Sequence, residues 1–294
     1  MDTQIVAIFC LCDDILKGLH HYEDKQCKMS DAEVMTTAIV AALHFRGNWE
    51  QARELLGHGG YIPTMLGKSR FNRRLHAICA LFLTVFQVLG EVFKQLNTDS
   101  VYVIDSFPIA ACDNIRIRRA RRYQDEAYRG YIASKRRYFY GLRIHVLVTA
   151  TGEPVEAFLA PGADADVRAL HRFQFDLPTG SIIYADSAFT HYCVEDLMRE
   201  AGISLQPLRK KNSKRPVPPY VAYLQARGRK IVETTGSLIE RLLPKSIHAV
   251  TSQGFELKVM LFVLACSVSC AVWVATWVTY TSLALSLPAI ILRE

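Results

Sequence analysis

The feature that most constrains the fold is the segment VYVIDSFP at 101–108. Its β-branched and aromatic residues form a run that stops at a carboxylate, Asp105, and a polar turn. Val103 and Ile104 suit a strand that is covered on both faces. Asp105 would lose free energy if it stayed unpaired at the end of a buried strand, so we expect a cation, a set of hydrogen bonds or a metal beside it. An aspartate that caps the next helix is the ordinary alternative.

A second apolar run, SIIYADSA at 181–188, also ends in an aspartate, Asp186. Two strands of one sheet would then bring Asp105 and Asp186 to the same edge. Carboxylate oxygens at such an edge are suitable ligands for a divalent metal. The repetition therefore predicts a metal site.

Basic residues are concentrated in two blocks, although the formal net charge is only +7. Residues 116–143 contain ten Arg and Lys against two acidic residues, and residues 201–232 contain eight and no acid. Such blocks beside the candidate carboxylates predict a polyanion partner such as nucleic acid. A pair of solvated basic loops is the alternative.

The first 97 residues have the pattern of an all-α region. Ser30 and Glu33 form a capping-box pattern before an apolar helix that ends at Gly47, and residues 49–56 suit a short helix. Ser69 is expected to cap one long helix that runs from residue 70 to about residue 93. Its basic first turn opposes the helix dipole, which indicates an external anion. Both a DNA-reading helical unit and an ordinary bundle fit this pattern.

From residue 98 the pattern alternates between strands and helices. Strands are expected at 101–108, 138–149, 155–159, 181–185 and 203–208, with helices at 166–175 and 193–200. This order predicts the α/β class, with a mixed sheet flanked by helices. His145 lies in the middle of the second strand, where a core histidine is the expected role.

A third acidic group is expected from a helix that opens at Arg229. Glu233 follows Arg229 by four residues, so the two share a helix face. Two aspartates and a glutamate are hard oxygen ligands, which favour Mg²⁺ or Mn²⁺ over zinc. Two such ions can stabilise the attacking and the leaving oxygen of a phosphodiester displacement.

Seven segments occur in an order that resembles a known family: SDAEVMTTAIVAALHFRG, SRFNRRLH, DSFPIAAC, YFYGLRIHVLVT, IIYADSAFTHY, RKIVETTGSLIERLLPKSIHAVTSQGFELKV and LFVLACSVSC. Together they are similar to bacterial insertion-sequence transposases of the DDE, ribonuclease-H-like class. The resemblance implies a ribonuclease-H-like domain at 98–271 and a catalytic, metal-binding triad of Asp105, Asp186 and Glu233. It also implies cleavage at the ends of the element and strand transfer to target DNA, with Mg²⁺ or Mn²⁺, by a homo-oligomer in the bacterial cytoplasm, at the nucleoid.

The chain departs from the pattern of related families at three positions. The tyrosine that those families place before the arginine is Ala226, and the lysine expected after the glutamate is Glu240. Glu240 is therefore the alternative third carboxylate. The helix-start aspartate of the family matches Asp166, but the histidine that often precedes it is Ala165.

The candidate DNA contacts come from both basic blocks, from the basic helix near residue 70 and from the helix that carries Glu233. They are Arg70, Arg73, Arg74, Arg118, Arg119, Arg121, Arg122, Lys135, Arg136, Arg137, Lys210, Lys211 and Arg229. A ribonuclease-H-like nuclease that does not join strands and an inactive DNA-binding remnant are the alternative functions. A tyrosine recombinase is disfavoured, because the chain contains no His-x-x-Arg.

The C-terminal region is hydrophobic. Residues 259–292 contain no Asp, Glu, Lys or Arg, a stretch long enough to cross a bilayer. We expect its first part to be a helix buried in the domain, and no stable membrane association. The tail at 272–294 matches nothing in the family pattern, and a strain-specific extension and a frameshift product both remain open. The eight cysteines lack zinc-site spacing, and no signal peptide is evident.

Overall fold

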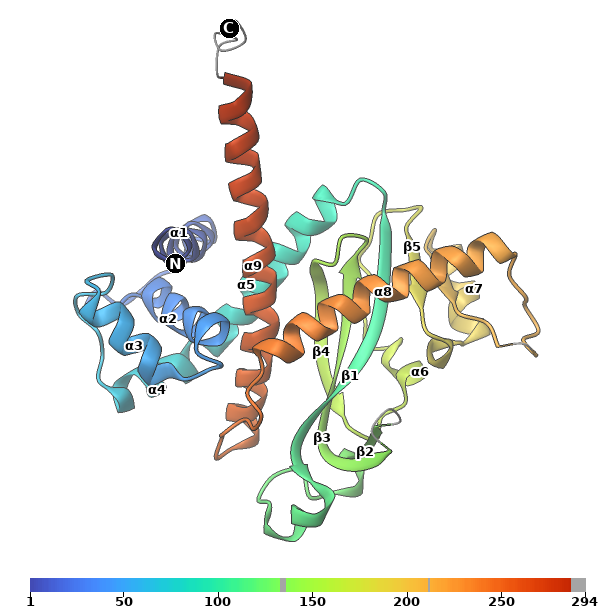
Figure 1. The fold of residues 1–294 in the computed structure, drawn as a ribbon, viewed down its shortest axis with the longest axis horizontal. Helices are drawn as coiled ribbons and strands as arrows, with labels where there is room; N and C mark the ends of the chain where they lie inside the picture. Colours follow the sequence, from blue (N-terminus) through green and yellow to red (C-terminus); the bar gives the residue numbers. More distant parts are fainter. Residues whose placement is uncertain (133–135, 211, 287–294) are drawn as a thin grey trace, which may run out of the picture.

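The computed structural model describes residues 1–132, 136–210 and 212–286 (Figure 1). Helices from the N-terminal region lie on one side, and a sheet with its own helices lies on the other. The last helix, α9 (Ser252–Ser286), lies between them and packs against α2, α5 and strand β4. One main hydrophobic core includes residues from both sides. The boundaries expected at residues 97 and 271 stay a prediction.

The N-terminal region is helical, as expected. Its helices are α1 (Asp2–Gly18), α2 (Asp31–His44), α3 (Trp49–His58), α4 (Lys68–Ala77) and α5 (Cys79–Leu96). The predicted capping box is present at α2: the Ser30 hydroxyl accepts from the Glu33 N–H at 3.1 Å, and the Glu33 carboxylate accepts from the Ser30 N–H at 2.7 Å. Such caps stabilise a helix start by about 1 kcal/mol.

The single long helix expected from residue 70 is wrong. The structure has two helices, which are separated at Ile78, and α4 begins after Gly67 without a side-chain cap from Ser69. The Arg74 guanidinium pairs with Glu23 and with Asp31, each at 2.8 Å. Acids within the chain therefore balance this arginine, and an external anion is not needed to explain it.

Within the described residues the sheet has six strands: β1 (Val101–Asp113), β2 (Arg129–Ile132), β3 (Arg137–Thr149), β4 (Pro154–Pro161), β5 (Ile182–Ala185) and β6 (Ser204–Pro207). Their order is β2-β3-β1-β5-β6, and β4 also pairs with β3. Strand β3 is antiparallel to β1, β2 and β4, whereas β1, β5 and β6 are parallel. The predicted mixed sheet flanked by helices is confirmed.

Several elements differ in length from the expectation. Strand β1 continues to Asp113, and the short strand β2 was not predicted. Helix α6 (Asp166–Ala169) is a single turn, while α7 (Tyr192–Glu200) is close to its expected range. Helix α8 (Pro219–Leu242) begins ten residues before the expected start at Arg229, with a proline in its first turn. Proline is well tolerated there, because the first N–H groups of a helix have no partner within it.

The two faces of the sheet are covered differently. On one face, Val103, Val146, Val148 and Tyr184 form a small cluster with Val232 of α8, which crosses the sheet (Figure 1). On the other face, residues such as Tyr102 and Ile104 join the main core. Because side chains alternate along a strand, Asp105 lies on the same face as Val103, under α8.

In the part of the chain that the structure describes, two helices are long and apolar enough to cross a membrane by length and composition alone: α5, and the part of α9 at 252–273. About 33% of α5, and 56% of the most apolar 18-residue stretch of α9, is buried inside the protein. Buried core helices of soluble proteins can be equally long and apolar. The expectation of no stable membrane association stays a prediction.

His145 is fully buried in the sheet core. Its ring stacks on Phe158 at a centroid distance of 5.1 Å, and within the described residues neither ring nitrogen has a hydrogen-bond partner. Burial lowers the pKa of His145 from 6.5 to about 3, and the nearby charges of Arg143 and Arg172 add to this effect. The imidazole is therefore neutral at physiological pH.

We expect His145 to make the fold sensitive to acid. Below pH 6.5 the unfolded chain protonates this histidine, but the folded chain does not until about pH 3. Stability is then lost as the pH falls through this window, by about 1.4 kcal/mol per pH unit for this one group. Urea unfolding at pH 8 and pH 5 should show a smaller loss for His145→Phe than for the wild type. The exposed-site control His58→Gln should behave like the wild type, and an equal loss in all three proteins would contradict the neutral state of His145.

Two glycines of α8 can be used to test how closely this helix packs on the sheet. A Cβ at Gly236 would be 3.6 Å from the Phe107 ring, an ordinary contact, whereas a Cβ at Gly228 would be 3.0 Å from the Tyr184 ring and 3.3 Å from Val103. Alanine in a helix interior is favoured over glycine by about 1 kcal/mol, so Gly236→Ala should raise Tm by about 2 °C. Gly228→Ala should lose this gain to crowding. Equal gains in thermal melts would show that α8 is not closely packed on Tyr184.

Candidate active site

Asp105 and Asp186 are neighbours at the end of the parallel pairing between β1 and β5. Ile104 and Ala185 are the last residues paired in this register, and each aspartate follows directly. Strand β5 ends there, but β1 continues to Asp113 beside β3, so the expectation that the first strand stops at Asp105 is wrong. Adjacent strands are separated by about 4.8 Å. Both aspartates are half-buried and line the same pocket. The structure therefore brings the two carboxylates to one pocket, as expected, although Asp105 lies within β1 and not at its end.

The pocket is small and is roofed by α8. Val103, Ile104, Ala185, Gln225 and Val232 complete its lining, and its volume is about 10 Å³. This is close to the space that one water molecule needs. Gln225 and Val232 are seven residues apart, so they lie two turns apart on one side of the helix.

Gln225 is the polar group that the roof contributes, and sequence reasoning missed it. Its side-chain NH₂ donates to the carbonyls of Gln206, at 3.1 Å, and of Pro207, at 3.4 Å. Its side-chain oxygen is buried and, among the described residues, has no hydrogen-bond partner. The only signal in the sequence is the seven-residue spacing to Val232, which has no meaning until α8 is known to begin at Pro219.

Backbone N–H groups orient both carboxylates. The Ser106 N–H donates to Oδ1 of Asp105 at 2.8 Å, and the Ser187 N–H donates to Oδ1 of Asp186 at 2.6 Å. Asp186 also caps a short 3₁₀ turn, η4 (Ser187–Phe189). The capping role and a place in the pocket are thus compatible, and the capping alternative does not exclude a site.

A hydrogen-bond network on the opposite face of the sheet supports Asp105 indirectly, through Ser106. The Ser106 hydroxyl donates to Oδ1 of Asp166 at 2.5 Å, and Arg143 donates to that hydroxyl at 3.0 Å and to Asp166 at 3.4 Å. Asp166 and Arg143 are each 18% exposed. This network fixes the residue whose N–H holds Asp105. It also gives Asp166, the residue that matches the family's helix-start aspartate, a structural role.

The two candidate third carboxylates lie on the solvent-facing side of α8. Glu233 and Glu240 are both exposed. Gly228 lies against Val103 and Gly236 lies against Phe107, so the turn that contains Glu233 is level with Asp105. Glu240 is farther along the helix by about 10 Å. Within the described residues, no group of three His, Cys, Asp or Glu side chains is arranged to hold a metal.

The donor atoms nevertheless suit a divalent metal in kind. Asp105, Asp186 and Gln225 offer oxygen atoms, the type of ligand that Mg²⁺ and Mn²⁺ prefer. Two of the three predicted acidic residues line the pocket, and the third lies on the helix that roofs it. The site thus fits the type of ion, although the structure does not bring the predicted triad together.

The predicted DNA-contacting residues fall into three groups. The exposed ones are Arg70, Arg73, Arg118, Arg119, Arg121, Arg136, Arg137 and Lys210. The second group, Arg74 and Arg122, contacts the protein itself: Arg122 stacks over the Phe255 ring at 5.1 Å, and Arg74 forms the ion pairs described above. Lys135, Lys211 and the side chain of Arg229 lie outside the described part of the chain.

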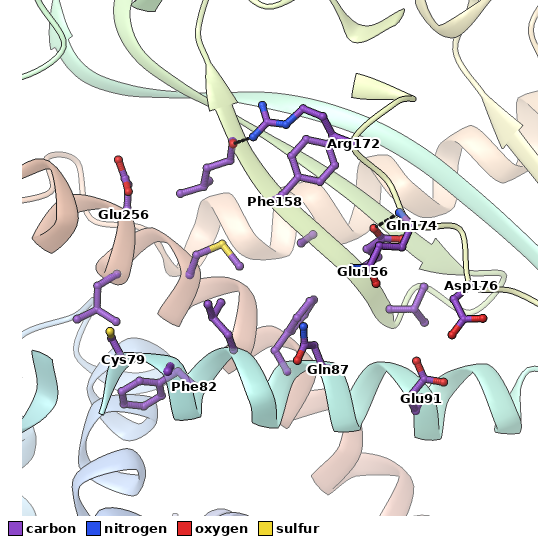
Figure 2. A pocket seen from close by; sticks show the side chains of 18 of the residues that line it. Cys79, Phe82, Gln87, Glu91, Glu156, Phe158, Arg172, Gln174, Asp176 and Glu256 are labelled. Atoms are coloured by element: carbon purple, nitrogen blue, oxygen red, sulfur yellow. Dashed lines mark hydrogen bonds between the residues drawn. The ribbon is translucent and has the colours of Figure 1, made fainter. Parts of the chain in front are cut away.

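A much larger pocket, of about 770 Å³, lies at the β4 edge of the sheet, between α5, β4 and the start of α9 (Figure 2). Phe82 and Phe158 contribute to its apolar lining. Its charged lining includes four acids, Glu91, Glu156, Asp176 and Glu256, against Lys94 and Arg172. An acidic surface is unsuitable for DNA. It shares no lining residue with the pocket of Asp105 and Asp186, so the two are separate.

Comparisons with known proteins identify the family of this chain. A sequence profile described as a transposase DDE domain matches residues 95–246, whereas no curated protein matches the chain. Among solved structures, the cryo-EM structure of a piggyBac transposase synaptic complex with hairpin DNA aligns with 99% of this chain and 81% of that chain, at 9% identity and a TM-score of 0.44. The profile match spans just over half of the chain and includes both pocket aspartates, so the chain belongs to the DDE transposases, enzymes that cut DNA and join its strands in a metal-dependent reaction.

Proposed function

We propose that this transposase releases the ends of an insertion sequence and joins them to target DNA at the pocket formed by Asp105 and Asp186. The observation that carries the proposal is the parallel register of β1 and β5, which places the two carboxylates next to each other. The ion would be Mg²⁺ or Mn²⁺, with two ions bound in the active complex. Bound there, the ions supply Lewis-acid stabilisation of the attacking and leaving oxygens of a phosphodiester.

The protein's own contribution is to fix the ligands and the DNA. The N–H groups of Ser106 and Ser187 each hold one oxygen of an aspartate, so both carboxylates keep a fixed direction at the pocket. No side chain has to form a covalent bond with DNA. The same site can therefore serve hydrolysis and then joining, when a 3′-hydroxyl replaces water as the nucleophile.

For the third carboxylate we propose Glu233. It is level with Asp105 along α8, as the contacts of Gly228 and Gly236 indicate, whereas Glu240 is about two turns farther on. The Glu233 side chain is exposed, so it can turn toward the pocket without displacing the core when a cation draws it there. The carboxylate joins the site at that step.

We propose that the partner is double-stranded DNA, bound by a homo-oligomer at the nucleoid of a bacterial cytoplasm. Exposed arginines on the η1 turn (Asn114–Arg119), which follows β1, and near it support the DNA partner. Joining the two ends of one element requires both ends to be held together, which supports an oligomer. The bacterial setting rests on the resemblance of the sequence motifs.

The carboxylates provide the direct test. Asp105→Asn and Asp186→Asn should reduce cleavage of element-end DNA to background, because an amide supplies less negative charge to a cation. Glu233→Gln should do the same, whereas Glu240→Gln should keep wild-type cleavage. All four should bind DNA as the wild type does in EDTA, since affinity comes mainly from phosphate contacts.

The products of the same reaction separate the alternatives. Denaturing gels should show joined strands and no DNA attached to protein. Cut ends that are never joined would indicate a plain nuclease, and no metal-dependent cut in any DNA would indicate a binding remnant. Normal cleavage by Asp105→Asn would exclude the site.

Replacing exposed arginines should affect DNA binding, whereas replacing an arginine that packs inside the protein should affect stability. Replacing Arg118, Arg119 and Arg121 by Gln should weaken binding to all sequences and flatten the plot of log K against log salt, by about 0.9 for each phosphate that is no longer neutralised. Arg122→Gln should mainly lower Tm, because it removes the stacking over Phe255. The control Arg199→Gln, at an exposed arginine of α7, should change neither. An unchanged salt slope in the triple variant would show that those arginines are only solvated.

A further inference from the structure

Gln225 combines two properties that are seldom found together. It is 1% exposed, and its side-chain oxygen has no hydrogen-bond partner among the described residues. A buried amide oxygen without a partner loses the free energy of its hydration, which is of the order of 1–3 kcal/mol. Such an atom calls for a ligand that the protein chain itself does not supply.

The orientation of the amide follows from its other contacts. Two backbone carbonyls, of Gln206 and Pro207, face one end of the amide at 3.1 and 3.4 Å. Carbonyl oxygens accept hydrogen bonds only, so the NH₂ group must be at that end and the oxygen at the other. The reversed amide would place three oxygen atoms together. The Gln225 oxygen is thus fixed by β6, the strand next to β5.

The residue also lines the pocket of Asp105 and Asp186. One buried amide oxygen and two carboxylates form a set of three oxygen donors from three elements, namely β1, the end of β5, and α8. Amide carbonyls of Gln and Asn are ordinary ligands of hard cations. Val232, the other α8 residue in the pocket, closes it with an apolar surface. The set is complete without any movement of Glu233.

We propose that the Gln225 side-chain oxygen is a direct ligand of the divalent cation held by Asp105 and Asp186. The inference rests on the proposed function for the cation, but it adds a ligand from the side of α8 that faces the sheet. A neutral donor is suited to this position, since a third carboxylate would add repulsion between like charges before the ion binds. Glu233 then reaches the site from the solvent side.

The experiment measures metal binding in the full-length protein without DNA. Bound Mn²⁺ is followed by the loss of the free-ion EPR signal, for wild type, Gln225→Leu and Gln225→Met, with Asp105→Asn to identify the site. Gln225→Leu should weaken Mn²⁺ binding by at least about tenfold, which is the lower end of losses at metal-site residues. Folding of each variant is checked by circular dichroism and thermal melting.

Cadmium separates a ligand from a residue that only holds the helix in place. Methionine replaces a hard oxygen by a soft sulfur at a similar distance, and soft donors favour soft metals. Less Cd²⁺ should therefore displace half of the bound Mn²⁺ in Gln225→Met than in Gln225→Leu. Cadmium taken up by cysteines is the same in both proteins.

The outcomes distinguish this inference from the function on which it rests. Wild-type Mn²⁺ affinity in Gln225→Leu, or the same cadmium displacement in Gln225→Leu and Gln225→Met, would overturn the ligand role while leaving Asp105 and Asp186 in place. Equal Mn²⁺ binding by wild type and Asp105→Asn would instead contradict the proposed metal site itself.

Discussion

The parallel pairing of β1 and β5 sets the carboxylates of Asp105 and Asp186 next to each other, and two carboxylates so placed repel. The register of β1 and β5 leaves Asp105 and Asp186 no freedom to separate, because Ile104 and Ala185 are paired just before them. N–H donors from Ser106 and Ser187 reduce the repulsion. In the proposed complex, a divalent cation would offset it further. The strand pairing that builds the core thus also sets the spacing on which the proposed metal site depends.

The close approach of α8 turns this sheet edge into a pocket. Gly228 allows the helix to lie against Tyr184 and Val103, where a larger residue would crowd both. Gln225 and Val232 lie on either side of that contact and form the roof. On the other face of the sheet, Asp166 and Arg143 hold Ser106. The position of Asp105 therefore depends on packing on both faces of the sheet.

Sequence patterns predicted the parts of the site that depend on local structure. Apolar runs that stop at Asp105 and Asp186 indicated two neighbouring strands, and the structure has both strands with the aspartates in one pocket, although β1 continues past Asp105 to Asp113. The start of α8 was missed because residues 219–228 include proline, glycine and two tyrosines, which are weak helix formers, and the packing of Gln225 and Gly228 against the sheet supports the helix there. The break at Ile78 was missed for the opposite reason: the apolar spacing typical of a helix continues across it. The role of Gln225 depends on carbonyls of β6, which no spacing in the sequence reveals.

The number of arginines in the sequence did not predict how much positive charge is available to DNA. Arginine serves in this chain both as an internal ion-pair partner and as exposed charge, and the sequence does not separate the two. Arg209 forms two hydrogen bonds with the buried carboxylate of Glu195, at 2.9 and 2.6 Å, and it stacks on Tyr192 together with Arg215. These arginines shape the basic loop after β6, and their charge is largely balanced within the protein. Arg118, Arg119 and Arg121 lie on or near an exposed turn, so the positive potential available to DNA is concentrated there.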